Sequence, residues 1–323
     1  MSGLSPDPES LAARRAERPT DETLAWVGST LGGAVVATRR LTGGISAGMD
    51  VVEIERGGDR ELVVLRRYVN DVWLSVDPDL AWREARVLEH LGTHGVPAPR
   101  LLAVDGDGSG AGAVCLVMTH VAGRTEHQPT DRQAWLDGLV ATVLAIHRVP
   151  VTPELGLRDH DAQLDVDIGL PRPVRHGHQV DEDLWTVVAA NWPTVTRRPI
   201  TLVHADYHPG NVLWDDGRVS AVVDWTIATT GQATADLCYL RLDVSLALGL
   251  DVGDEVSESY RRLAGEELED RPFWDFLAAV RAHGFVDSWW GSYVEFGLTD
   301  LPLAVVEERY ETFLARARSE LGD

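Results

Sequence analysis

The stretch HADYHPGN at residues 204–211, followed by VVDW at residues 222–225, determines the fold that we expect for this chain. Short apolar runs at 201–203, 212–214 and 220–223 surround it and are separated by polar turns, a pattern that predicts short strands. A hairpin of such strands carries Asp206, Asn211 and Asp224 at its ends. We therefore expect these three side chains to form one site.

The three side chains suit phosphoryl transfer. That reaction needs a carboxylate that orients the attacking hydroxyl and accepts its proton, and oxygen ligands that hold Mg²⁺ on the nucleotide phosphates. Asp206 is the candidate for the first role. Asn211 and Asp224 are the candidates for the second, because Mg²⁺ prefers oxygen donors.

Two other interpretations of the same stretch remain open. Aspartate and asparagine often cap turns, so the hairpin is also compatible with a purely structural role. The spacing of His204, Asp206 and His208 is also compatible with zinc ligation in a hydrolase. Zinc ligation would leave the positions of Asn211 and Asp224 unexplained.

The first half of the chain has the pattern of an antiparallel sheet. Apolar runs at 34–37, 49–55, 61–67 and 113–118 predict strands, and the helical spacing of apolar residues over 80–91 predicts one helix inserted between them. Between the first two strands, Gly43, Gly44 and Ser46 lie in a glycine-containing turn whose backbone N–H groups can approach phosphates.

The second half is mainly helical. Helices are predicted over Asp131–His147, Asp181–Asn191, Thr234–Leu248, Val256–Ala264 and Leu303–Leu321, and a loop over Pro171–Gln179. The chain is thus expected to be α+β, with an N-terminal sheet lobe over 1–118, in which 1–20 form a loose tail, and a helical lobe over 119–323.

Composition limits the possible partners. The formal net charge is −22, and the chain contains no lysine, so all 29 basic residues are arginine. An acidic surface repels nucleic acid and favours a cationic small molecule. Two distant cysteines and the lack of any long apolar stretch indicate a cytoplasmic protein without a membrane segment or disulfide framework.

The motif H-x-D-x-x-x-x-N, followed by an apolar residue and Asp224, resembles the catalytic loop and metal-binding turn of kinases. With Asp-Trp at 224–225, this motif resembles that of the aminoglycoside phosphotransferase and choline kinase family. The resemblance of the chain to this family extends over about Leu24 to Leu314. This resemblance implies a bilobal protein-kinase-like fold, Asp206 as catalytic base, His204 as support for the loop, and Asn211 and Asp224 as metal ligands. It also implies that Asp236 anchors the helix that follows it.

The resemblance implies a nucleotide site as well. Arg66 stands where kinases place a phosphate-pairing lysine, and Glu84 stands where they place its partner. Because strand neighbours face opposite ways, one of Arg66 and Arg67 should be exposed, and we expect Arg66 to face inward. The remaining expected contacts to the nucleotide base are hydrogen bonds from Thr119 and Val121 and apolar contacts from Val64, Leu213 and Val223.

The expected function is transfer of the γ-phosphate of ATP or GTP to a hydroxyl of an aminoglycoside-like, macrolide-like or other small metabolite. The alternatives are a catalytically silent nucleotide-binding pseudokinase and the zinc hydrolase. Acceptor choice should reside in the C-terminal helices, where aromatic residues either contact the acceptor or, as their spacing favours, pack the helices together. These residues are Trp274, Trp289, Trp290 and Tyr293, with Asp275, Asp287 and Glu295 nearby.

Overall fold

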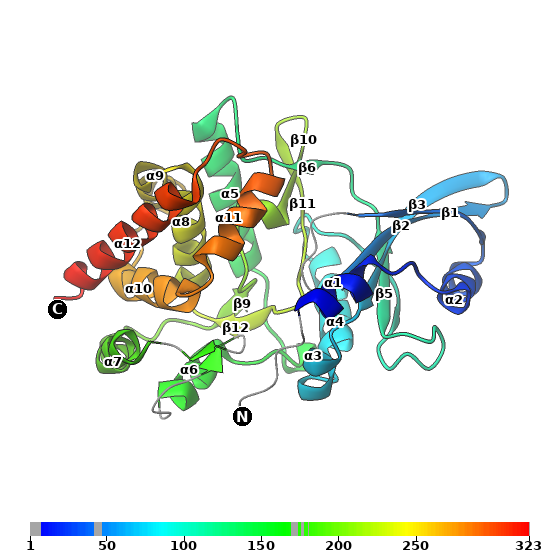
Figure 1. The fold of residues 1–323 in the computed structure, drawn as a ribbon, viewed down its shortest axis with the longest axis horizontal. Helices are drawn as coiled ribbons and strands as arrows, with labels where there is room; N and C mark the ends of the chain where they lie inside the picture. Colours follow the sequence, from blue (N-terminus) through cyan, green and yellow to red (C-terminus); the bar gives the residue numbers. More distant parts are fainter. Residues whose placement is uncertain (1–7, 42–46, 169–173, 176–177, 180, 323) are drawn as a thin grey trace. The chain divides into compact units, whose positions relative to one another are not determined.

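The computed structural model describes residues 8–41, 47–168, 174–175, 178–179 and 181–322 (Figure 1). The chain divides into two compact units, Met1–Val121 and Ala122–Asp323. The sequence predicts the boundary slightly earlier, after Met118. Within the described residues, no helix combines the length and the apolar character needed to cross a membrane.

The first unit is built on one five-stranded antiparallel sheet with the strand order β1-β2-β3-β5-β4. Its strands are β1 (Ala34–Arg40), β2 (Ala47–Arg56), β3 (Asp59–Tyr68), β4 (Leu101–Asp105) and β5 (Cys115–Thr119). Its helices are α1 (Pro8–Ala16), α2 (Asp21–Leu31), α3 (Asp71–Val76) and α4 (Leu80–Gly92).

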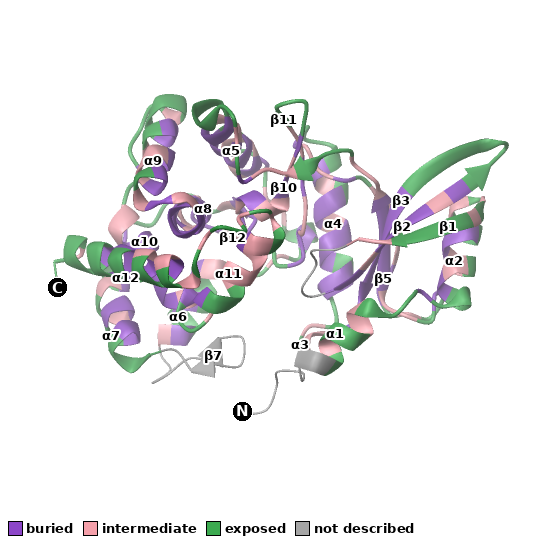
Figure 2. Cartoon of the chain, turned by 45° about the horizontal axis from the view of Figure 1, so that its top comes forward, coloured by how far each residue is buried: buried purple, intermediate pink, exposed green. Residues whose placement is uncertain are grey.

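Helices cover both faces of this sheet. Val63 and Leu65 of β3 pack with Val27 of α2 in one apolar cluster. The alternate residues of β3 point to the other face, where Arg66 meets Glu84 of α4. Figure 2 shows α4 buried over most of its length. The predicted sheet and inserted helix are confirmed.

Two expectations for this unit were wrong. Arg67 is buried along with Arg66, at 6% and 3% exposure, so neither is the exposed neighbour that alternation predicts. The reason is that the face of Arg67 is covered too: its guanidinium donates to the carbonyl of Glu17, just after α1, and pairs with Asp50. Correspondingly, the predicted loose tail contains helix α1 from Pro8 onward.

The second unit is mainly helical, as predicted. Its helices are α5 (Arg132–His147), α6 (His160–Ile168), α7 (Glu182–Asn191), α8 (Thr234–Leu248), α9 (Leu250–Ala264), α10 (Arg271–Ala282), α11 (Val286–Glu295) and α12 (Leu303–Glu320), with 3₁₀ turns η1 (Pro153–Leu155), η2 (Trp192–Thr194) and η3 (Pro209–Asn211). Helix α8 lies at the centre, and Figure 2 shows it buried almost throughout.

Short strands carry the loops of this unit. β6 (Arg124–Thr125), β10 (Val212–Asp215) and β11 (Arg218–Val222) form a three-stranded sheet, and β9 (Thr201–Val203) pairs with β12 (Thr229–Gly231). The predicted loop over 171–179 contains the paired strands β7 (Val174–Arg175) and β8 (His178–Gln179). Residues 204–211 therefore leave one small sheet at β9 and enter the other at β10.

Candidate active site

The loop at 204–211 is fixed to helix α8 by one buried carboxylate. Asp236 accepts hydrogen bonds from the backbone N–H groups of His204 and Ala205, both at 2.8 Å, and lies 3.0 Å from His147 Nε2. Burial alone would raise the pKa of Asp236, but the hydrogen bond and charge of His147 and the contacts from His204 keep this pKa below its ordinary value. Asp236 was expected to anchor the helix that follows it, but it lies within helix α8 and joins that helix to the loop.

Two residues of the site have a left-handed backbone that is uncommon outside glycine. Ala205 has φ 67° and Asp224 has φ 63°. Such conformations cost about 1–3 kcal/mol each and persist only where the surroundings determine them. At Ala205 the bond to Asp236 supplies that restraint.

Asp206 presents a partly exposed carboxylate, with 31% of its side chain accessible. The side-chain amide nitrogen of Asn211 donates to the Asp206 carbonyl at 2.9 Å and to its Oδ2 at 3.1 Å. The loop therefore aligns the carboxylate from one side and leaves it open on another. These contacts also direct the amide oxygen of Asn211 away from Asp206.

The hairpin brings Asn211 and the residues before Asp224 together. Val212 pairs with Val222, and the N–H of Val223 donates to the carbonyl of Asn211 at 2.9 Å. The hydroxyl of Thr226 donates to Oδ1 of Asp224 at 2.7 Å. An amide oxygen and a carboxylate at the same end of a hairpin are donors of the kind that Mg²⁺ takes, so these residues fit that ion.

His204 is used entirely within the fold. Its Nε2 lies 3.0 Å from the carbonyl of Val223, its Nδ1 accepts the N–H of Asp206 at 3.3 Å, and its ring packs on Trp225. With both nitrogens engaged, it has no lone pair for a metal. Among the described residues, no group of three or more His, Cys, Asp or Glu side chains is arranged to hold a metal ion, so the alternative zinc site is not formed.

In the first unit, the expected ion pair is present. Arg66 Nη1 lies 3.3 Å from Glu84 Oε1, and the hydroxyl of Tyr68 donates to Glu84 Oε2. Val64 precedes this arginine by two positions in β3 and is 7% exposed. Gly43, Gly44 and Ser46 lie outside the described residues.

The end of β5 and the segment after it have fewer free backbone N–H groups for a nucleotide base than the sequence predicts. The N–H of Thr119 is bonded to the carbonyl of Arg100, and the N–H of His120 to the carbonyl of Leu62. The N–H of Val121 makes no hydrogen bond within the described part of the chain. Leu213 of β10 and Val223 after β11 are partly exposed.

Comparison with known proteins identifies the family. A family model described as "Phosphotransferase enzyme family" matches residues 42–277, which include the 204–211 loop, Asp224 and Asp236. The chain belongs to the phosphotransferase enzyme family. The family and the enzyme class predicted from the sequence are thus confirmed.

Two curated relatives of this phosphotransferase match only part of its length. Acyl-CoA dehydrogenase family member 11 of Rattus norvegicus is 26% identical over 230 residues, which make up 61% of this chain and 29% of the rat protein. An aminoglycoside 3'-phosphotransferase of Streptomyces fradiae is 28% identical over 154 residues, or 44% of this chain and 56% of that protein. The matches therefore span less than two thirds of either relative.

A solved structure confirms the kinase-like fold. A thermostable mutant of aminoglycoside phosphotransferase APH(4)-Ia, in a ternary complex with ADP and hygromycin B, superposes with a TM-score of 0.59 over 91% of this chain and 98% of the other. The two sequences are 17% identical, so the likeness concerns the fold alone.

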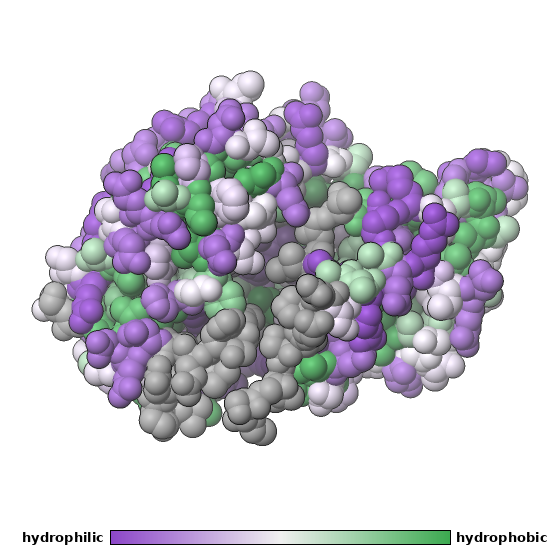
Figure 3. All heavy atoms as spheres, viewed as in Figure 1, coloured by the Kyte–Doolittle hydropathy of each residue, from purple (hydrophilic) through white to green (hydrophobic). Residues whose placement is uncertain are grey.

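The aromatic residues near the C-terminus of this phosphotransferase serve mainly as core. Trp274 and Tyr293 are each 2% exposed, and Trp289 and Trp290 pack partly buried against the same cluster. Asp275 is buried in ion pairs with Arg241 and Arg271, whereas Asp287 and Glu295 are exposed. Figure 3 shows hydrophilic and hydrophobic residues mixed over one face of the molecule.

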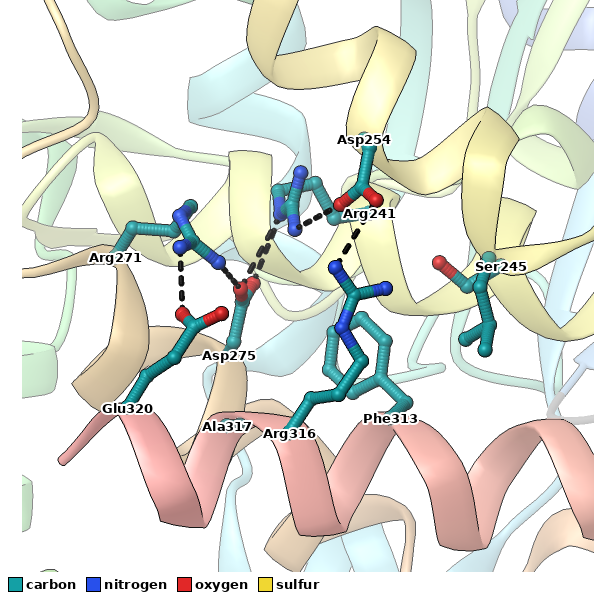
Figure 4. A pocket seen from close by; sticks show the side chains of 10 residues that line it. Arg241, Ser245, Asp254, Arg271, Asp275, Phe313, Arg316, Ala317 and Glu320 are labelled. Carbon is teal, nitrogen blue, oxygen red and sulfur yellow. Dashed lines mark hydrogen bonds and ion pairs between the residues drawn. The ribbon is translucent and has the colours of Figure 1, made fainter. Parts of the chain in front are cut away.

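A small cavity of about 10 Å³ lies within the second unit (Figure 4). Asp206 is not among the residues that line it. Arg241, Arg271 and Arg316 are paired there with Asp254, Asp275 and Glu320. Because each arginine has an acidic partner, the cavity is part of a structural ion network between α8, α9, α10 and α12.

Sequence reasoning did not place three residues beside the 204–211 loop. They are Tyr239 and Asp243 of α8, and Tyr293 of α11, whose hydroxyl donates to Asp243. Tyr293 appeared only as an aromatic residue of the C-terminal helices. The helical spacing of Asp236, Tyr239 and Asp243, which places them on one face of α8, is the signal that would have indicated two of them.

Proposed function

We propose that the chain is a magnesium-dependent small-molecule kinase that transfers the γ-phosphate of ATP or GTP to a hydroxyl of an aminoglycoside-like, macrolide-like or other small metabolite. The observation that carries the proposal is the partly exposed carboxylate of Asp206, aligned by Asn211 on a loop that Asp236 fixes to α8. A carboxylate prepared in this way suits a group that receives a proton from a bound hydroxyl.

Asp206 would orient the acceptor hydroxyl and take its proton as the oxygen attacks phosphorus in line. His204 would keep the loop in shape through its bonds to Val223 and to the N–H of Asp206. Asn211 and Asp224 would hold Mg²⁺, which when bound neutralises charge on the nucleotide phosphates.

Residues of the first unit are proposed to bind the nucleotide. Arg66, oriented by Glu84, would contact its phosphates, and the glycine-containing turn with Gly43, Gly44 and Ser46 would contribute backbone N–H groups. Base contacts are proposed for Val64, Leu213, Val223, the carbonyl of Thr119 and the N–H of Val121. The occupied N–H of Thr119 restricts that residue to its carbonyl.

The acidic composition supports a cationic acceptor, and the free, buried Cys115 and Cys238 support a cytoplasmic location. The mainly structural roles of Trp274 and Asp275 leave fewer aromatic and acidic residues for binding a cation than the sequence offered.

The test is a phosphate-transfer screen with ATP and GTP over a panel of hydroxyl acceptors, with and without Mg²⁺. We expect Asp206→Asn to lower transfer about 10²–10⁴-fold, because the carboxamide cannot accept the proton, while nucleotide binding measured by calorimetry persists.

Asp215→Asn is the matched control, since Asp215 is an exposed aspartate at the end of β10. It should transfer phosphate like the unchanged protein. Full turnover by Asp206→Asn would refute the assigned base. Nucleotide binding without transfer to any acceptor would favour a pseudokinase instead.

A further inference from the structure

Helix α8 contacts the catalytic loop at two points. Asp236 and Asp243 are seven residues apart and share a face of the helix with Tyr239, because side chains recur on one face at intervals of three or four. Asp236 binds the backbone at the start of the loop. Asp243 reaches the loop two turns later, near His208.

Asp243 is a buried carboxylate that is only partly compensated. It is 4% exposed, its Oδ2 accepts the hydroxyl of Tyr293 at 3.1 Å, and the same oxygen lies 3.7 Å from His208 Nδ1. Its Oδ1 is buried and accepts no hydrogen bond from the described residues. A buried carboxylate is costly unless polar or charged partners surround it, and the partners of Asp243 are Tyr293 and His208.

His208 lies between this carboxylate and Asp206. Its Nε2 is 3.9 Å from Asp206 Oδ2, on the same carboxylate oxygen that Asn211 contacts. Its Nδ1 accepts the N–H of Gly210 at 3.3 Å, and its ring packs edge-on against Tyr239. The 3.9 Å separation exceeds a hydrogen bond, but such contacts at catalytic groups are often long until substrate binds.

We propose that His208 is a positioning residue for the catalytic carboxylate of Asp206, and that Asp243 and Tyr293 hold His208 in place. The inference rests on the proposed function of Asp206. Asn211 and the imidazole of His208 both contact Oδ2 of this carboxylate. The orientation of Asp206 toward an acceptor hydroxyl is thereby set by helix α8 through two separate contacts.

The experiment measures release of inorganic phosphate from ATP, with water taking the place of the organic acceptor. His208→Asn and His208→Gln form a matched pair. Asparagine retains a group near Nδ1 but cannot reach Asp206, whereas the glutamine amide can donate from the position of Nε2. Asp243→Asn and Tyr293→Phe test the support, and Asp215→Asn, an exposed change at the end of β10, is the control.

We expect His208→Asn and Asp243→Asn to lower kcat about 10- to 100-fold, because small displacements of a catalytic group have effects of that size. KM for ATP should stay unchanged. His208→Gln should recover most of kcat, Tyr293→Phe should show a smaller loss, and Asp215→Asn none. A lowered kcat with an unchanged KM distinguishes a positioning role from a general loss of structure, which would lower the melting temperature and raise KM.

Unchanged kcat in His208→Asn and Asp243→Asn would overturn the inference alone. So would losses that His208→Gln does not recover, or that appear only with a raised KM for ATP. Absence of phosphate release by the unchanged protein, with every acceptor and with water, would overturn the proposed function and this inference with it.

Discussion

His127 is a buried histidine of the second unit. It is 2% exposed, its ring stacks on Phe296 at 4.7 Å, and neither of its nitrogens is bonded within the described residues. Burial, and secondarily the charge of His208, lowers its pKa to about 4. The neutral form is therefore the one compatible with the fold.

Acid should destabilise the protein through this residue. Because the folded pKa of about 4 lies below the unfolded value of about 6.5, His127 contributes its stability above pH 6.5 and loses it as pH falls toward 4. The loss is at most about 3 kcal/mol. Urea unfolding of the unchanged protein and of His127→Phe at several pH values measures it. If the free energy of unfolding depended on pH identically in the two proteins between pH 6.5 and 4, His127 would not be the residue responsible.

Single residues also mark where sequence reasoning succeeds. The spacing of His204, Asp206 and Asn211 identified the loop, because those residues are neighbours in the chain. Asp243 was missed because its partner Tyr293 is fifty residues away, and sequence gives no pairing at that separation. The burial of Arg67 was missed because strand alternation assumes an open face, which α1 covers here.

Among the elements, α8 joins the 204–211 loop on one side to the ion network on the other. Arg241 of α8 is 3% exposed, and its Nε lies 3.1 Å from Asp275 of α10. Arg271 reaches the same carboxylate and also pairs with Glu320 of α12. Asp275 and Arg271 of α10 thus connect α8 to α12 (Figure 4).

Removing that aspartate should be costly. Asp275→Ala leaves Arg241 with its charge buried and its main partner lost, so we expect the free energy of unfolding to fall by about 3–5 kcal/mol. Arg316→Gln is the control, since the Arg316–Asp254 pair is about half exposed and should contribute about 0–1 kcal/mol. Equal effects of the two changes on chemical denaturation would show that burial does not govern this network.

Helix α4 was predicted from its apolar period, whereas helix α1 and strand β4 were missed. The apolar residues of α4 recur on one face, and its existence and length followed from them. Helix α1 lacks such a face, and its contacts are polar: the carbonyls of Arg15 and Glu17 accept from Arg40. Strand β4 is five residues long and follows a segment rich in proline, so its pairing with β5 was not apparent.

For the whole molecule, the proposed division of roles predicts ligand-dependent stability. A nucleotide that binds only the folded chain stabilises it by about 2.7 kcal/mol at a hundred times its Kd. We expect ATP or GTP with Mg²⁺ to raise the melting temperature, and the increase to shrink in Asp224→Ala, which lacks one proposed metal ligand. Comparing the two nucleotides by thermal shift indicates the preferred donor, and no shift with either would contradict nucleotide binding.

The two thiols have a practical consequence. Cys115 and Cys238 are both fully buried, and burial raises the pKa of Cys115 to about 12, so neither should react readily with alkylating dyes. The lack of lysine removes side-chain amines as competing targets. A fluorophore can therefore be attached at one engineered surface position, such as Thr312→Cys on α12, with little background. Titrating nucleotide against such labelled protein would give binding curves without a radioactive tracer.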